Sequence, residues 1–297
     1  MFSCEKTERE ISSKSPNFQQ IKQALALLNK KNKISNHNGF WYLTDCQQNS
    51  FKFNQQKKYK SQIQKNKISV LKIKKINRWI KTIKWLPYLR EVFLTGTLAM
   101  KRGDTKSDWD VLVVTAQNRI WLGRLFLTIW LQLIGKRRSD NKVTDRFCLN
   151  QFITEGSLCF QERNEFSANE IMFARALFDN STVQVNFLQA NVHWIKKLKP
   201  NFHPHNIISS YKTTQTSIFL RIKLLLETIL EQLRFAEKLN QVIKKIMIAY
   251  IVRNPKTYTE RADVRYSDFF LVFLPYPQRQ VIRQKTYQAI RALSKKN

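Results

Sequence analysis

The sequence reads Leu-Thr-Gly-Thr at residues 94–97 and Asp-Trp-Asp-Val-Leu-Val-Val at residues 108–114, with ten residues between the two stretches. Each stretch adjoins an apolar run, which predicts one strand that ends at the turn and a second that leaves the aspartates. Alternate residues of a strand point to the same side, so Asp108 and Asp110 present two carboxylates together while Trp109 faces away. Paired carboxylates predict a site for Mg²⁺ or Mn²⁺, because these cations prefer oxygen ligands.

The turn before the aspartates has the composition of a phosphate site. Gly96 lets backbone N–H groups approach a phosphate closely, and Thr97 adds a hydroxyl donor. Three cationic side chains follow in the intervening loop, at Lys101, Arg102 and Lys106. We therefore predict that this segment holds the triphosphate of an NTP, such as ATP, beside the metal. The alternative is an ordinary turn followed by a capped strand.

The arrangement resembles the nucleotidyltransferase superfamily of the DNA polymerase β type. Its signature is an apolar residue, Gly, then Gly or Ser, a spacer of similar length, and Asp-x-Asp or Asp-x-Glu before an apolar strand. Thr97 departs from that pattern and keeps the hydroxyl. The resemblance implies an α/β fold, a small mixed sheet flanked by helices. It also implies Mg²⁺-dependent transfer of a nucleoside monophosphate from an NTP to an acceptor hydroxyl or similar group.

The likeness extends further along the chain. The order of segments from residue 16 to 200 is similar to a group of bacterial nucleotidyltransferase-domain proteins, which implies the fold and the metal site and names no acceptor. Members of the superfamily normally add a third carboxylate on a later strand, predicted here over residues 146–154. The matching position is Asn150, whose amide can ligate a metal and cannot accept a proton. Asp145, near the start of that strand, is the alternative third acid.

The charge of the chain is strongly basic. Lys and Arg number 52 against 21 acidic residues, a net charge of +31 that attracts polyanions. A lysine-rich composition explains part of this charge, but no acid occurs from residue 46 to 90 or from 180 to 226. Residues 57–84 carry eleven Lys or Arg. This stretch is a candidate nucleic-acid contact, with an ordinary solvated face as the alternative.

The same stretch has the pattern of an amphipathic helix. Its apolar residues fall on one helical face, at Ile76, Trp79, Ile80 and Ile83. The basic helix and Asn150 support a rival to the enzyme. In that rival the chain is a weakly active or non-catalytic nucleotidyltransferase scaffold, acting as a basic nucleic-acid-binding or regulatory protein.

The rest of the chain divides into four expected regions. Residues 1–55 show a helix and then a hairpin around Asn38-Gly39, which indicates a partial winged helix or a unit that packs on the core. Residues 56–90 form the basic helical linker, residues 91–200 the nucleotidyltransferase core, and residues 201–297 a helical C-terminal region.

Local patterns add detail within these regions. Helices are expected at residues 120–134, 165–178 and 217–251, the last with a break near Leu239-Asn240. Residues 182–187 alternate weakly, as a strand would.

Cysteines and apolar runs indicate the compartment. The four cysteines lack metal-ligand spacing and the N-terminus lacks an apolar run, so we expect reduced thiols in a cytoplasmic protein. The apolar residues 125–134 fall short of the roughly 20 needed to span a bilayer, which favours a buried helix over a membrane-surface one. His203 and His205 have no acid or cysteine nearby, so a loop is favoured over a metal site there.

Overall fold

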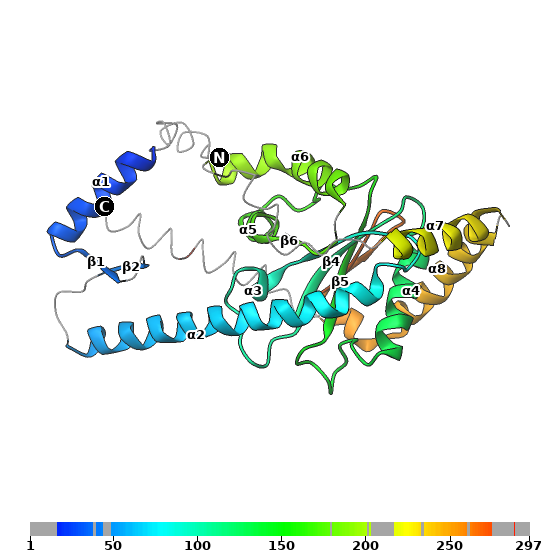
Figure 1. Cartoon of the computed structure of the whole chain (residues 1–297), viewed down its shortest axis with the longest axis horizontal. Helices are drawn as coiled ribbons and strands as arrows, with labels where there is room; N and C mark the ends of the chain where they lie inside the picture. Colours follow the sequence, from blue (N-terminus) through cyan, green and yellow to red (C-terminus); the bar gives the residue numbers. More distant parts are fainter. Residues whose placement is uncertain are drawn as a thin grey trace, which may run out of the picture. The chain divides into compact units, whose positions relative to one another are not determined.

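The computed structural model describes residues 17–37, 40–43, 49–178, 180–200, 202, 217–232, 235–259, 262–274 and 288 (Figure 1). The chain divides into two compact units, residues 1–64 and 65–297.

The first unit contains a helix followed by a hairpin. Helix α1 (Phe18–Lys30) begins with a capping box, in which Asn17 and Gln20 each accept a hydrogen bond from the other's backbone N–H. Strands β1 (Ile34–His37) and β2 (Phe40–Leu43) pair antiparallel. The helix and the hairpin predicted in this part of the chain are confirmed.

Helix α2 (Asn49–Ile80) is 32 residues long and runs from the first unit into the second, where a 3-10 turn, η1 (Lys81–Ile83), follows it. Within the second unit, Ile73, Ile76 and Ile80 are fully buried along one side of the helix. The predicted amphipathic helix is therefore present, and its apolar face packs into the core.

A mixed sheet of six strands forms the centre of the second unit, in the order β6-β3-β4-β5-β8-β7. Only β4 and β5 pair in parallel, and the other neighbours are antiparallel. The strands are β3 (Leu89–Leu94), β4 (Trp109–Thr115), β5 (Phe147–Thr154), β6 (Arg175–Ala176), β7 (Asp263–Tyr266) and β8 (Phe270–Leu274).

Helices cover both faces of this sheet (Figure 1). Besides α2, the second unit contains α3 (Gly96–Ala99), α4 (Ile120–Leu133), α5 (Glu165–Phe173), α6 (Ser181–Leu198), α7 (Ser217–Gln232) and α8 (Phe235–Arg253), with a 3-10 turn η3 (Pro255–Tyr258). Alternate residues of β4 belong to two separate cores. Val113 packs with α2, α4 and α8, whereas Val114 packs with α5 and α6. Alternate side chains of β4 thus pack into two different cores, in agreement with the alternation predicted for this strand.

Four expectations about the chain after residue 164 need correction. The helix predicted over residues 165–178 ends at Phe173, because Arg175–Ala176 pair with β3. Residues 182–187, which alternate weakly, lie in helix α6. Leu239-Asn240, where a break in the long helical region was expected, lie inside helix α8, and α7 ends earlier, at Gln232. The region predicted to be helical after residue 200 also supplies strands β7 and β8.

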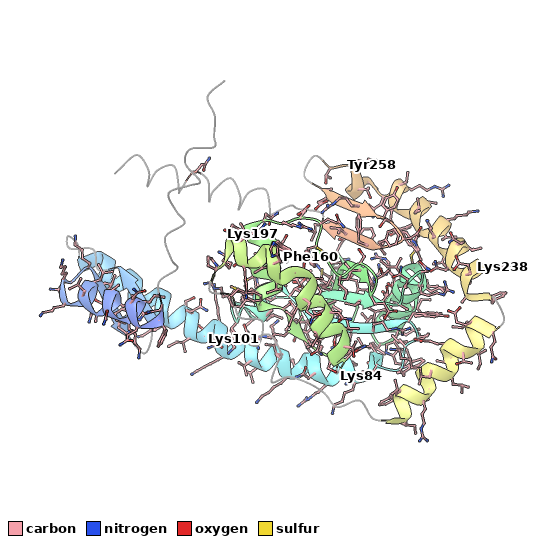
Figure 2. All side chains as sticks on the ribbon, turned by 90° about the horizontal axis from the view of Figure 1, so that it is seen from above. Lys84, Lys101, Phe160, Lys197, Lys238 and Tyr258 are labelled. Atoms are coloured by element: carbon pink, nitrogen blue, oxygen red, sulfur yellow. The ribbon has the colours of Figure 1, made fainter. Side chains whose placement is uncertain are left out.

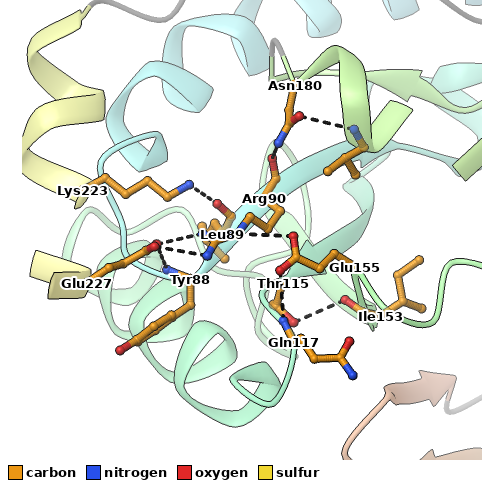
Figure 3. A network of polar contacts seen from close by, with 11 residues as sticks. Tyr88, Leu89, Arg90, Thr115, Gln117, Ile153, Glu155, Asn180, Lys223 and Glu227 are labelled. Carbon is orange, nitrogen blue, oxygen red and sulfur yellow. Dashed lines mark hydrogen bonds and ion pairs between the residues drawn. The ribbon is translucent and has the colours of Figure 1, made fainter. Parts of the chain in front are cut away.

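Helix α7 is held against the sheet by ionic and polar side chains (Figure 3). The Lys223 ammonium donates to the carbonyl of Leu89, and Glu227 accepts from Arg90 Nη1 at 2.8 Å and from the Tyr88 N–H at 2.6 Å. The opposite side of the helix is aliphatic and exposed, at Ile218, Ile222, Leu225 and Ile229. This helix therefore turns Lys223 and Glu227 inward, together with Leu230, which packs against the cluster around Tyr88.

Candidate metal centre

The site forms where the parallel strands β4 and β5 begin. Asp108 directly precedes β4, Asp110 is its second residue, and Asp110 lies opposite Cys148 of β5. One carboxylate oxygen from each aspartate and the Cys148 sulfur all lie within 4.8 Å of one another. Among the residues that the structure describes, these three side chains form the group suited to hold a metal ion.

Gly96 closes one side of this group. It follows strand β3 with φ of 66°, and the preceding Thr95 N–H donates to the Asp110 carbonyl at 3.0 Å. A Cβ atom at position 96 would lie 2.4 Å from Asp110 Oδ2. Only glycine combines this backbone conformation with so close an approach. The turn and the aspartates are therefore in direct contact.

A chain of hydrogen bonds joins the acids to their neighbours. Arg138 Nη1 donates to Asp108 Oδ2 at 2.7 Å and to the Cys148 sulfur at 2.9 Å. The Cys148 thiol donates to Asn150 Oδ1 at 3.0 Å, and Asn150 Nδ2 lies 3.4 Å from Asp110 Oδ1. Asn150 thus stands beside the aspartates and presents its amide hydrogens to one of them.

The electrostatics of the site favour a bound cation. Burial, followed by the charges of Asp108 and Glu170, raises the pKa of Asp110 to about 7, and the Arg138 charge opposes them. Burial, with the charges of Asp110 and Asp108, raises the pKa of the Cys148 thiol to about 12. The charge of Asp108 disfavours ionisation of Asp110, and a divalent ion bound beside them would relieve that repulsion. The thiol is neutral near pH 7 and acts as a hydrogen-bond donor.

Asp145, the alternative third acid, lies elsewhere. Its carboxylate pairs with Lys72 at 2.8 Å and with Lys75 at 2.9 Å, both from helix α2. It is not part of the group that Asp108 and Asp110 form. Its partners tie the start of β5 to helix α2, which is a structural role.

The candidate phosphate-binding residues surround the turn. Thr97 is exposed in the short helix α3, and Arg102 and Lys106 are exposed in the loop that follows. Lys101, labelled in Figure 2, is half-buried and has a left-handed backbone with φ of 56°. The loop is anchored to α2, since the Gly103 N–H donates to Ser69 Oγ at 3.0 Å. The loop that carries them is thus connected to helix α2 at Gly103.

Three side chains of the site were missed from the sequence. Cys148 stands two residues before Asn150, so the strand pattern that selected Asn150 also carried a signal for Cys148. Arg138 reaches the site from the loop after α4, and Glu170 influences it from α5. Neither has a characteristic spacing from the aspartates, because their positions depend on how distant elements pack.

Two other expectations concern regions away from the site. The apolar residues 125–134 largely belong to α4, whose Leu127 and Leu131 are buried in the core. In the described ranges, no helix is both long and apolar enough to cross a membrane. His203 and His205 lie outside the residues that the structure describes.

Comparison with known proteins returns no family model, no curated protein and no solved structure that matches this chain. The chemistry of the site therefore follows from its own residues.

Proposed function

We propose that this chain is a metal-dependent nucleotidyltransferase that transfers a nucleoside monophosphate from an NTP to an acceptor group. The observation that carries the proposal is the contact between the Gly96 turn and Asp110, with Asp108 alongside. A turn that offers backbone N–H groups to phosphate and two carboxylates that hold a metal are the parts that phosphoryl chemistry needs.

The residues present fit Mg²⁺ or Mn²⁺. Asp108 and Asp110 supply hard oxygen ligands, and the missing Cβ at position 96 leaves Asp110 Oδ2 room beside the turn. When bound, the metal supplies activation of the acceptor hydroxyl and neutralises charge on the leaving pyrophosphate. Gly96 and Thr97 hold the triphosphate, and Lys101, Arg102 and Lys106 add positive charge around it.

The arrangement of strands supports assigning residues 91–200 to the DNA polymerase β-like nucleotidyltransferase fold. The turn follows β3, the aspartates open β4, and β4 runs parallel to the strand that carries Asn150. The helix and hairpin of residues 18–43 support a partial winged-helix unit in the same way.

Asn150 limits the chemistry. It occupies the place of the third acid and cannot take a proton from the acceptor, while Asp145 is held by two lysines. General-base assistance is typically worth about 10²–10⁴ in rate. The wild-type protein should therefore bind NTP with metal and turn it over slowly.

Release of pyrophosphate from a panel of NTPs and acceptors, with Mg²⁺ or Mn²⁺, tests the proposal. We expect metal-dependent release that is lost in Asp108→Asn and Asp110→Asn. Asp104→Asn is the matched control, because Asp104 lies in the same loop and its oxygen accepts from the Lys106 N–H, which an asparagine also allows. Release that survives in both aspartate variants, or that needs no divalent ion, would exclude this site.

A second candidate function rests on helix α2. Its exposed side carries Lys67, Lys74 and Arg78, opposite the buried isoleucines, and Lys81 of η1 follows them. A basic stripe of this kind suits a nucleic-acid backbone, and such binding weakens steeply with salt because counterions are released. Under this reading the chain is a basic nucleic-acid-binding scaffold with little or no turnover.

Fluorescence anisotropy with labelled DNA and RNA, measured across a salt series, tests this candidate. Lys74→Glu with Arg78→Glu should weaken binding and flatten the salt dependence. Lys197→Glu, an exposed lysine of helix α6 (labelled in Figure 2), is the control. If the control weakens binding as much as the α2 variant, attraction is general and the stripe is not an interface.

A further inference from the structure

Arg138 occupies a special place among the side chains of the site. A single nitrogen, Nη1, donates both to Asp108 Oδ2 at 2.7 Å and to the Cys148 sulfur at 2.9 Å. These two residues belong to the group whose ligand atoms lie within 4.8 Å of one another. The guanidinium thus uses the same carboxylate that a metal ion would use.

From this geometry we infer that Arg138 competes with the metal for Asp108 and, once displaced, binds the triphosphate of the nucleotide. The inference rests on the proposed function and adds to it a positioning residue that the sequence signature does not contain.

The competition follows from space and charge. A guanidinium and a divalent cation cannot both occupy Asp108 Oδ2. With the cation on the other oxygen, the two positive charges still repel each other across one carboxylate. Arg138 is always charged, and its bond to a carboxylate is of the strong, charge-assisted kind. Metal binding must either break this bond or place two cations on one carboxylate, so Arg138 lowers the affinity of the site for metal alone.

The backbone around Arg138 stays in place while its side chain can move. Gly135 turns the chain after helix α4 with φ of 63°, and the Arg138 N–H donates to the Phe147 carbonyl at 3.0 Å. The side chain itself is 40% exposed, so solvent reaches it and rotation does not require unpacking of the core. The guanidinium therefore remains within one side-chain length of Asp108 after it is released.

Phosphate is the chemical partner for the released guanidinium. Its planar fork matches phosphate oxygens as it matches a carboxylate. A triphosphate carried by a metal at Asp108 and Asp110 would bring anionic oxygens next to the loop that holds Arg138. Arg138 thus weakens the binding of metal alone and strengthens the binding of metal together with triphosphate. The site would fill preferentially with the metal–nucleotide complex.

Calorimetry with Mn²⁺ alone, and then with inorganic tripolyphosphate at saturating Mn²⁺, tests the inference on the full chain. In Arg138→Ala we expect affinity for Mn²⁺ to rise about 10- to 100-fold, the scale of a hydrogen bond to a charged group. Affinity for tripolyphosphate should fall by about tenfold or more on the same grounds. The opposite signs separate this role from a purely structural one, which would weaken both.

Two further variants control the experiment. Arg137→Ala removes an equal charge from the same loop, and it should change neither affinity by more than about twofold if contact rather than general charge is responsible. Arg138→Gln keeps a polar side chain of similar reach and should behave like Arg138→Ala.

The outcomes are distinct. If Arg138→Ala binds Mn²⁺ no more tightly than the wild type, the competition is refuted while the metal site stands. If Arg137→Ala shows the same gains and losses, the specific contact is refuted. If neither wild type nor variants bind Mn²⁺, this inference and the proposed function fail together.

Discussion

Replacement of Gly96 by alanine probes the contact on which the proposed function depends. Two separate demands act at this position: a left-handed backbone with φ of 66°, and a methyl group placed 2.4 Å from Asp110 Oδ2. The first demand costs about 1–2 kcal/mol for an L-residue. The second forces Asp110 or the turn to move, at a cost of about 1–3 kcal/mol for an overpacked position. We therefore expect Gly96→Ala to lower the free energy of unfolding by about 2–5 kcal/mol.

The chain contains a matched control for the backbone part of this cost. Gly135 has nearly the same conformation, with φ of 63°, and a Cβ atom there would meet nothing within 4 Å. Gly135→Ala should therefore cost only about 1–2 kcal/mol. The difference between the two variants measures the steric contact with Asp110. Adding Gly96→Ala to an Asp110→Ala background should cost less than in the wild type, because the oxygen at 2.4 Å is gone and only the Cβ of residue 110, at 3.1 Å, remains close.

Urea unfolding of the four variants gives these free energies, and calorimetry with Mn²⁺ reports the site. Since the added methyl displaces Asp110 from its place beside Asp108, Gly96→Ala should weaken Mn²⁺ binding at least about tenfold, whereas Gly135→Ala should leave it unchanged. If Gly96→Ala and Gly135→Ala cost the same and both bind Mn²⁺ as the wild type does, the close packing of turn and aspartate is refuted.

Three further predictions concern Asn150, Cys148 and Glu91. Asn150→Asp should raise pyrophosphate release by up to about 10²-fold by supplying a base, while Asp145→Asn should leave the release nearly unchanged. If Asp145→Asn instead abolishes release and Asn150→Asp does not raise it, Asp145 is the third acid. Cys148→Ser should keep Mn²⁺ affinity within about threefold and weaken Zn²⁺ more than about tenfold, because thiolate suits the softer ion; calorimetry with both ions decides. Burial raises the pKa of Glu91 from 4.5 to about 7, so the folded protein holds a proton between these pH values that the unfolded chain has lost. The free energy of unfolding should then fall by about 3 kcal/mol as pH rises through this window, and Glu91→Gln should flatten the decline in urea titrations; an unchanged slope would show that Glu91 is not responsible.

The features that local pattern predicts well are those fixed by neighbours in the chain. Strands β3 and β4, helix α4 and the buried face of α2 follow from periodicity, and the proximity of Asp108 and Asp110 follows from alternate strand positions. Asn150 was placed beside them by the expectation of a third site residue on a later strand, and the structure shows that this strand, β5, pairs with β4.

The features that were missed depend on contacts between distant segments. Strand β6 has only two residues, too few to show a period, and it forms because Arg175–Ala176 meet the edge of β3. The weak alternation at residues 182–187 suggested a strand, but a helix can also place apolar residues at even spacing over a short window. Strands β7 and β8 join the sheet beside β5, more than one hundred residues earlier in the chain, and no local pattern specifies that partner.

The inward charge of helix α7 has a thermodynamic consequence. Heat capacity and denaturant dependence of unfolding both scale with the apolar surface that becomes exposed. Because Ile218, Ile222, Leu225 and Ile229 already face solvent, release of α7 exposes less new apolar surface than release of a helix with an aliphatic inner face. Detachment of α7 would therefore give a smaller change in heat capacity than detachment of such a helix, with Leu230 among the apolar contacts that are lost. Amide hydrogen exchange would register it, and added salt should change it little, because the Arg90–Glu227 pair is largely buried and therefore weakly screened.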